Sequence, residues 1–131
     1  MVTGAAGFIG ANLSQRLLNE VEDVKVIGLD SVNDYYDVSI KEYRLKQLSG
    51  YSTFTFIKEN IADKELVTSV FEKYKPEIVV NLAAQAGVRY SITNPDAYVE
   101  STWSAFSYSG GLSQLSGGAS RLRFFILCVW K

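Results

Sequence analysis

The sequence contains no histidine and a single cysteine, Cys128. Without histidine, the chain has no histidine base for catalysis and no histidine-ligated metal site. One cysteine allows neither an internal disulfide nor a metal site built from several cysteines, and such sparse use is typical of a reducing compartment. These absences exclude histidine-dependent enzymes and disulfide-stapled or zinc-stabilised small domains.

Strong charge and long apolar runs are also missing. The net charge is −1, so nothing indicates a general affinity for nucleic acid or for an anionic membrane surface. No apolar run is long enough to span a bilayer, and no charged-then-apolar leader precedes the first predicted strand. We therefore expect a cytoplasmic protein whose 131 residues are enough for one domain with its own core.

What the sequence does have is a glycine-rich start, MVTGAAGFIG, with Gly4, Gly7 and Gly10 spaced three apart. A short β-type entry precedes these glycines and an apolar-striped segment follows them, which predicts a strand that turns sharply into a helix. Free backbone N–H groups and the helix dipole then point at one place and attract a phosphate. Glycine triplets also occur in ordinary turns, so the meaning of this one depends on the residues that follow.

An acidic residue follows at the spacing that a dinucleotide site requires. Val24–Leu29 predicts a buried strand that stops at Asp30, twenty residues beyond Gly10. In a dinucleotide-binding fold an acid there accepts both hydroxyls of the adenosine ribose, and its charge repels a 2′-phosphate. The pattern therefore favours NAD over NADP. The alternative is that Asp30 only ends the strand and begins a turn.

Helices and strands are predicted to alternate along the first part of the chain. Ile9, Leu13, Leu17 and Val21 recur every four residues and predict a helix with one buried stripe. The later elements are predicted as a helix at Val38–Leu48, a strand at Phe54–Ile57, a helix at Lys64–Tyr74 capped by Asp63, and a strand at Ile78–Leu82. This alternation predicts an α/β fold, a Rossmann-type doubly wound parallel sheet truncated after about four strands.

Ligands of such sheets bind beyond the carboxyl ends of the strands, where further candidate residues lie. Asn60 and Ile61 follow the third strand and are candidate adenine contacts, although a simple strand-to-helix turn would use the same residues. The fourth strand breaks into Ala83–Gly87 (AAQAG), whose small residues admit either a cofactor or a closely packed helix. Tyr35 and Tyr36 either cover a bound nucleotide or pack their loop onto the domain.

Three stretches resemble the extended short-chain dehydrogenase/reductase family: Val2–Gly10 (VTGAAGFIG), Leu29–Asp37 (LDSVNDYYD) and Asn81–Glu100 (NLAAQAGVRYSITNPDAYVE). The last stretch narrows the resemblance to NAD-dependent nucleotide-sugar epimerases and dehydratases, and within them to the UDP-glucuronate 4-epimerase branch. The resemblance covers nearly all of residues 2–100, which implies a partial NAD-binding Rossmann domain over residues 1–100. Full-length members are expected to be homodimers that bind a nucleotide sugar.

The resemblance also implies a set of binding residues. The expected NAD contacts are Gly4, Gly7, Phe8, Ile9 and Gly10 at the pyrophosphate, Asp30 at the ribose, Asn60 and Ile61 at the adenine, and Leu82, Ala83, Ala84 and Gln85 along the centre of the cofactor. Arg89 and Ser91 fall in the loop that faces the nucleotide sugar. Without the resemblance, Arg89 is better explained as a surface charge.

The catalytic half of the family pattern is missing. In such epimerases NAD takes a hydride from C4 of the sugar and returns it to the other face, assisted by a tyrosine with a lysine four residues later. None of the eight tyrosines here has lysine at that position. The chain is therefore expected to be inactive alone. A non-catalytic NAD-binding or subunit-interaction module is one alternative, and a non-functional, aggregation-prone product is another.

The composition changes at Ser101. Residues 101–131 hold seven serines, four glycines and no acidic residue, and they show no helical stripe. One interpretation is a flexible or disordered linker that ends in a short apolar strand at Phe124–Trp130. The other is translation out of frame, because codons for Phe106–Trp130 can be chosen so that the next frame encodes SHILEACRNYPVEHLVYASSSSVYG. That peptide resembles the family's next helix, its fifth strand and its serine-bearing strand.

Overall fold

The computed structural model describes residues 1–34, 37–83 and 123–126. In this part of the chain five strands form one sheet in the order β3-β2-β1-β4-β5, and every neighbouring pair is parallel. The elements are β1 (Val2–Thr3), α1 (Phe8–Glu20), β2 (Val26–Asp30), α2 (Val38–Leu48), β3 (Phe54–Lys58), α3 (Lys64–Tyr74), β4 (Ile78–Asn81) and β5 (Arg123–Ile126). The predicted α/β class with a Rossmann-type sheet is confirmed.

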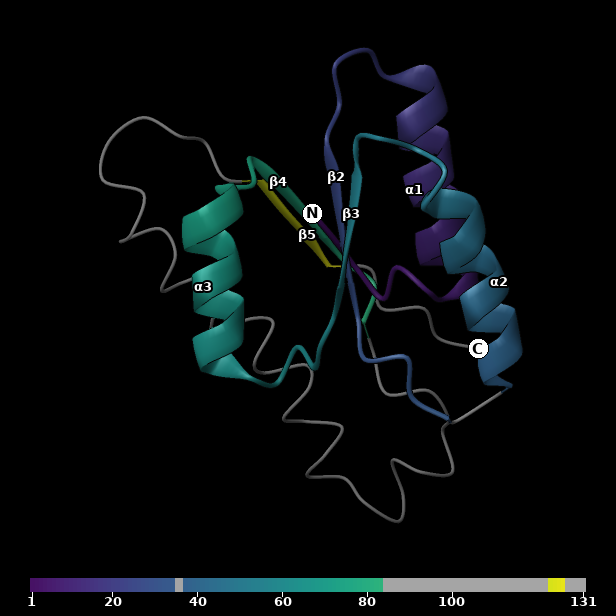
Figure 1. The fold of residues 1–131 in the computed structure, drawn as a ribbon. Helices are drawn as coiled ribbons and strands as arrows, with labels where there is room; N and C mark the ends of the chain where they lie inside the picture. Colours follow the sequence, from purple (N-terminus) through teal and green to yellow (C-terminus); the bar gives the residue numbers. More distant parts are fainter. Residues whose placement is uncertain (35–36, 84–122, 127–131) are drawn as a thin grey trace.

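The helices cover both faces of this sheet. α1 and α2 lie on one side of the strands and α3 lies on the other (Figure 1). From β1 the chain first builds outward through β2 to β3, and it then returns to place β4 on the other side of β1. The strand order thus reverses beside β1, which is the position where open α/β sheets form a crevice for ligands.

Most element boundaries match the sequence-based expectations. The predicted bounds of α2 and α3 are confirmed, and Asp63 caps α3 by accepting a hydrogen bond from the Leu66 N–H at 3.1 Å. Hydrogen bonds from the Ser39 side chain and backbone lower the pKa of Asp37, the residue that caps α2. β2 begins two residues later than expected, at Val26.

The tail contributes a further strand to the sheet, beside the four parallel strands β3-β2-β1-β4 that were expected. Arg123–Ile126 pairs in parallel with Ile78–Asn81, residue for residue. The expectation of a strand at Phe124–Trp130 is therefore confirmed for its first part, and the rest of that segment lies outside the described residues. The pairing supplies β4 with a second neighbour on the side away from β1.

The predicted buried stripe of α1 is wrong at its two ends, while Leu13 and Leu17 in its middle are half-buried. Ile9 and Val21 are exposed, whereas the buried residues of the helix are Gly10, Ala11 and Ser14. A four-residue repeat drifts around a helix of 3.6 residues per turn, so it leaves the contact face within a few turns. Small residues form the contact face instead, and they let α1 approach the sheet closely. Packing distance, more than apolar periodicity, selects the buried side of this helix.

A compact apolar cluster holds α3 against the sheet. Val67 and Phe71 of α3 are buried with Val79 of β4, and Met1 and Ile61 pack around them.

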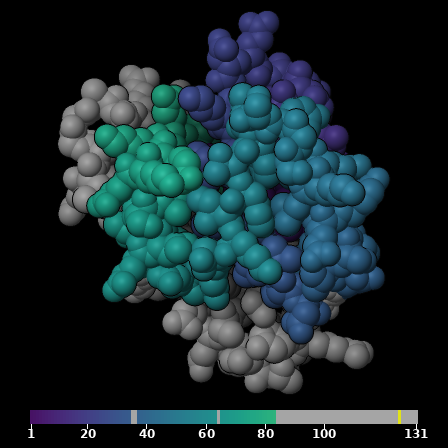
Figure 2. All heavy atoms as spheres, viewed as in Figure 1, coloured from purple at the N-terminus to yellow at the C-terminus, as the bar shows by residue number. Residues whose placement is uncertain are grey.

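The atoms of α3, β3 and α2 form one continuous surface on the face of the molecule that Figure 2 shows. Among the described residues no helix has the length and apolar character needed to cross a membrane.

Ser14 offers a direct test of how tightly α1 is packed. Its side chain is fully buried, and its Oγ atom has no hydrogen-bond partner among the described residues. A buried hydroxyl without a partner costs about 1–3 kcal/mol, so Ser14→Ala should raise the free energy of unfolding by about 1 kcal/mol or more, as measured by urea denaturation. Ser69→Ala in α3 controls for helix propensity, because Ser69 is exposed and its Oγ donates to the Leu66 carbonyl. Equal effects of the two substitutions would contradict this account.

Candidate functional site

The glycine-rich loop is shaped by backbone atoms that leave no room for side chains. Gly4 has a φ of +67°, and a Cβ there would lie 2.8 Å from the carbonyl carbon and oxygen of Leu82. A Cβ at Gly10 would lie 2.1 Å from the Gly4 carbonyl oxygen. Only glycine fits both positions. The loop therefore lies directly against the end of β4 and beneath the start of α1.

The start of α1 is open to an anion. Gly7 is the N-cap residue, no side chain caps the helix, and the first turn carries no acidic residue. The N–H groups of a first helical turn have no partner within the helix, and the helix dipole adds positive potential at that end. Phe8 and Ile9, the first two residues of the helix, are 70% and 42% exposed, so their side chains flank this end from outside.

Asp30 is connected to the glycine-rich loop. Its Oδ2 atom accepts a hydrogen bond from the Ala6 N–H at 3.0 Å, and its Oδ1 atom accepts one from the Val32 N–H at 2.8 Å. A carboxylate offers about four acceptor positions, so two backbone bonds leave capacity for two hydroxyl donors. The carboxylate is half-buried and fixed in direction, as a binding site for a ribose diol requires.

Thr3 joins β1 to the end of β4, a role that the sequence analysis missed. Its hydroxyl donates to Asn81 Oδ1 and accepts hydrogen bonds from the N–H groups of Leu82 and Ala83, each at 3.1 Å. Thr3 and Asn81 are both buried. The sequence did contain a signal for this contact. Thr3 and Asn81 are each the single polar residue at the end of an otherwise apolar strand.

Two basic residues of α2 reach the same region and were also missed. Lys41 is 4% exposed, and its Nζ atom donates to the carbonyl oxygen and to Oδ1 of Asn33 at 2.7 and 2.6 Å. Arg44 donates from Nη1 to the Ala6 carbonyl at 3.3 Å, and its guanidinium lies 5.7 Å from the centroid of the Phe8 ring. Residues three apart on a helix share a face, so α2 directs both cations toward the loops around Asp30.

The residues predicted beyond β3 have structural roles. Asn60 is exposed, and its Oδ1 atom accepts a hydrogen bond from the Ala62 N–H at 3.0 Å, which stabilises the turn into α3. Ile61 is half-buried against the cluster of Val67, Phe71 and Val79. These contacts agree with a strand-to-helix turn and leave contact with an adenine as a prediction.

Of the remaining predicted residues, two lie in the part of the chain that the structure describes and six lie outside it. Leu82 and Ala83 are half-buried and lie against Gly4 at the end of β4. Ala84, Gln85, Arg89, Ser91, Tyr35 and Tyr36 lie outside the described residues. The structure thus brings the glycines, Asp30 and the end of β4 together at one edge of the sheet.

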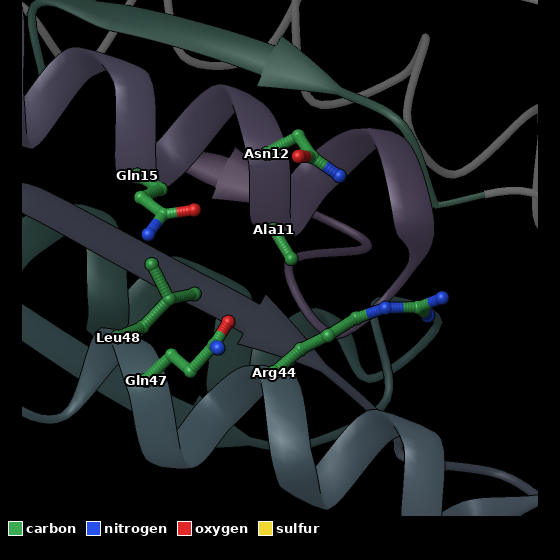
Figure 3. A pocket seen from close by; sticks show the side chains of 6 residues that line it. All are labelled: Ala11, Asn12, Gln15, Arg44, Gln47 and Leu48. Carbon is green, nitrogen blue, oxygen red and sulfur yellow. The ribbon is translucent and has the colours of Figure 1, made fainter.

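A small cavity lies between α1 and α2, next to this edge. Ala11, Asn12 and Gln15 line it from α1, and Arg44, Gln47 and Leu48 line it from α2 (Figure 3). Its volume of about 40 Å³ has room for a water molecule and is far too small for a nucleotide. Arg44 extends past the cavity toward the loop that precedes α1 (Figure 3).

The residues present fit a dinucleotide. The glycine cradle and the uncapped start of α1 suit a pyrophosphate, and the oriented Asp30 carboxylate suits a ribose. The described residues contain no cluster of three or more histidine, cysteine or acidic side chains that could hold a metal ion. Chemically, the described arrangement can bind and orient a cofactor.

The chain is similar in sequence to a known family and to known proteins. A family model described as GDP-mannose 4,6 dehydratase matches residues 1–107. The chain is 52% identical over 101 residues to a Staphylococcus aureus protein named CapI, and this covers 77% of the chain and 29% of CapI. It is 43% identical over 101 residues to a UDP-glucuronate 4-epimerase of Thermodesulfobacterium geofontis, covering 77% of the chain and 31% of that enzyme.

Solved structures of epimerases are also similar to this chain in fold. The UDP-glucuronic acid 4-epimerase of Bacillus cereus, in complex with UDP-glucuronic acid and NAD, matches with a TM-score of 0.64 and 35% identity, over 75% of this chain and 30% of that one. The UDP-glucose 4-epimerase of Thermotoga maritima matches with a TM-score of 0.70 and 26% identity, over 88% of this chain and 34% of that one.

The chain therefore spans about three-tenths of the length of the curated relatives it matches. The family match rests on the part of the sequence that contains the glycine cradle, Asp30 and the end of β4. On these grounds the chain belongs to the NAD-dependent epimerase/dehydratase family, the extended short-chain dehydrogenases/reductases.

Proposed function

We propose that this chain is an NAD-binding domain of a nucleotide-sugar 4-epimerase of the UDP-glucuronate type, inactive by itself. The observation that carries the proposal is the bond from the Ala6 N–H to Asp30 Oδ2, at 3.0 Å. It ties the ribose-binding acid to the loop that would hold the pyrophosphate, so both parts of the dinucleotide site are held in fixed relative positions. Such preorganisation lowers the entropic cost of binding.

In this proposal each strand end contributes to one part of NAD. Backbone N–H groups around Gly7 bind the pyrophosphate, and Asp30 accepts the hydroxyls of the adenosine ribose. Asn60 and Ile61 flank the adenine, while Leu82 and Ala83 lie along the centre of the cofactor. When bound, NAD supplies the hydride acceptor for transient oxidation at C4 of the sugar.

The substrate side of the proposal rests on the relatives. A UDP-glucuronate 4-epimerase and a structure that holds UDP-glucuronic acid are among them. We propose that Arg89 and Ser91 face the nucleotide sugar, and that the protein acts in the cytoplasm.

Calorimetric titration of the 131-residue chain tests cofactor binding. We expect NAD to bind at millimolar concentration or below, and Asp30→Asn to weaken this binding about tenfold because the ribose loses a charged acceptor. Absence of heat with millimolar NAD would contradict the proposal.

Asp37→Asn is the matched control for that substitution. It removes the same charge from the same loop, and asparagine caps a helix as well as aspartate does, so α2 keeps its first turn. Affinity for NAD should remain within about twofold of the unsubstituted chain, because Asp37 bonds to Ser39 and not to the glycine loop. Equal losses in the two variants would remove Asp30 from the site.

Catalytic inactivity has its own test. None of the eight tyrosines is followed by lysine at the fourth position, so the chain lacks the proton-transferring pair that the resemblance requires. Incubation with UDP-glucuronate and NAD should yield no UDP-galacturonate by NMR, even with the chain saturated in NAD. Turnover above the level of a heat-denatured sample would show that another residue serves as the base.

We propose that residues 1–100 form the family-derived domain and that residues 101–131 are translated out of frame. The family match ends at residue 107, and the alignments with several curated relatives cover 100–106 residues. Sequencing the encoding DNA should show codons that give the family-like peptide in the next frame over Phe106–Trp130. Codons that do not encode it would refute the frameshift and favour a genuine tail.

A further inference from the structure

The apolar residues that recur along α1 lie on the side of the helix that is turned away from α2. Asn12 and Gln15 of α1 line the small cavity toward α2. At about 3.6 residues per turn, Leu13 and Leu17 lie roughly opposite these two residues on the helix. Leu13 and Leu17 are half-buried, and Val21, which continues the repeat past the last turn, is 46% exposed. Leu13, Leu17 and Val21 thus form an apolar α1 stripe that the described residues cover only in part.

β4 and β5 present a second apolar surface on the same side of the sheet as α1. Val79 faces the opposite side, because it belongs to the cluster that holds α3. Side chains alternate along a strand, so Ile78 and Val80 face the α1 side, and Phe125 joins them because it pairs with Val80. Ile78 is 49% exposed, Phe125 is 54% exposed and Val80 is half-buried. These last three residues form the β4–β5 face.

The α1 stripe and the β4–β5 face lie side by side. α1 packs on β1 and β2 and against α2. Because α2 connects β2 to β3, it lies on the β3 side of α1, and the opposite side of α1 is directed toward β4. α1 carries the chain back from the carboxyl end of β1 to the start of β2, so its last turn lies level with Ile78 at the start of β4. The layer that α2 and α1 form on this side (Figure 1) therefore has a next position, above β4 and β5.

We propose that the α1 stripe and the β4–β5 face together form the docking surface for one amphipathic helix of a partner polypeptide. Parallel sheets are covered by helices on both faces. The 13 residues of α1 span about 20 Å, so a docked helix of similar length would run along the whole stripe. Its apolar side would pack on both surfaces while its polar side stayed in water. The inference does not depend on NAD binding, because none of these six residues belongs to the proposed cofactor site.

A second copy of the chain fits this surface less well than a separate helix does. The outer side of α1 carries an ion pair between Arg16 and Glu20, whose side chains are 75% and 58% exposed. If α1 of a second copy took the position above β4 and β5, its outer side would face that sheet and the ion pair would lose water. Burying charged groups against apolar side chains costs free energy. A separate helix leaves Arg16 and Glu20 in solvent.

The relatives offer a source for the helix. The chain spans about three-tenths of the length of the curated relatives it matches, and the family model matches residues 1–107. The partner in this proposal is the remaining seven-tenths of a family polypeptide, bound in trans.

Co-expression tests the docking. The full 131-residue chain is produced together with the UDP-glucuronate 4-epimerase of Thermodesulfobacterium geofontis from which the aligned stretch of 101 residues has been removed. The two polypeptides should copurify. Ile78→Lys and Val21→Lys should each weaken the association about tenfold or more in calorimetry, because the new charge would be buried against the helix. Both residues are exposed in the chain alone and lie outside the tail, so the result does not depend on β5.

Ile40→Lys is the matched control. Ile40 is 43% exposed and lies on α2, so the substitution adds the same charge to a similarly exposed isoleucine away from the docking surface. The association should stay within about twofold of that of the unsubstituted chain. Equal losses in Ile78→Lys and Ile40→Lys, or no loss in either, would overturn the proposal. So would a remainder that copurifies with its own removed stretch and not with this chain.

Labelling and sedimentation of the chain without the partner cover the case in which the remainder does not fold. In a Cys128→Ser background, Ile78→Cys and Ile40→Cys should react with a maleimide at rates within about threefold of each other, because both positions are exposed. A rate at position 78 that is slower by about tenfold or more would show that the chain covers the surface itself, and would overturn the proposal. A dimer in sedimentation that Ile78→Lys abolishes would assign the surface to a second copy and overturn it as well. A monomer that is labelled at both positions supports it.

Discussion

The structure depends on the close approach of three backbone segments at Gly4. The end of β4 lies on one side of this residue and the start of α1 on the other, at distances that no Cβ would allow. Because three chain segments meet there without side chains between them, the carboxyl ends of β1 and β4 and the N-terminus of α1 converge on one point. The strand order switches at this convergence, and the start of α1 there has no side-chain cap and no acidic residue in its first turn.

Hydrogen bonds fix the segments that meet at this contact. The Thr3 hydroxyl uses its donor and two acceptor positions on Asn81, Leu82 and Ala83, so its hydrogen-bonding capacity is filled. On the other side of β1, Asp30 joins two loops by accepting hydrogen bonds from the Ala6 and Val32 N–H groups. Two polar side chains, Thr3 and Asp30, therefore hold the main chain at the ends of β1, β2 and β4.

The sequence predicted the elements better than their contacts. Periodicity and capping residues located α2 and α3 because those signals are local. The spacing from Gly10 to Asp30 predicted an acid close to the glycine-rich loop, and Asp30 accepts a hydrogen bond from the Ala6 N–H of that loop. The stripe proposed for α1 was wrong because burial there depends on how closely the helix approaches the sheet. Thr3, Lys41 and Arg44 were missed because their partners, Asn81, Asn33 and Ala6, are set by tertiary folding.

These missed residues change how Asp30 is understood. An acid at the end of β2 is usually taken to exclude NADP through its own charge, yet its effect depends on the field in which it stands. Here α2 places a buried ammonium and a half-buried guanidinium beside that acid, each bonded to a loop that the acid also binds. The direction of the Asp30 carboxylate therefore depends on α2 as well as on the glycine-rich loop, because Arg44 and Lys41 bond to the two loops that also bind Asp30.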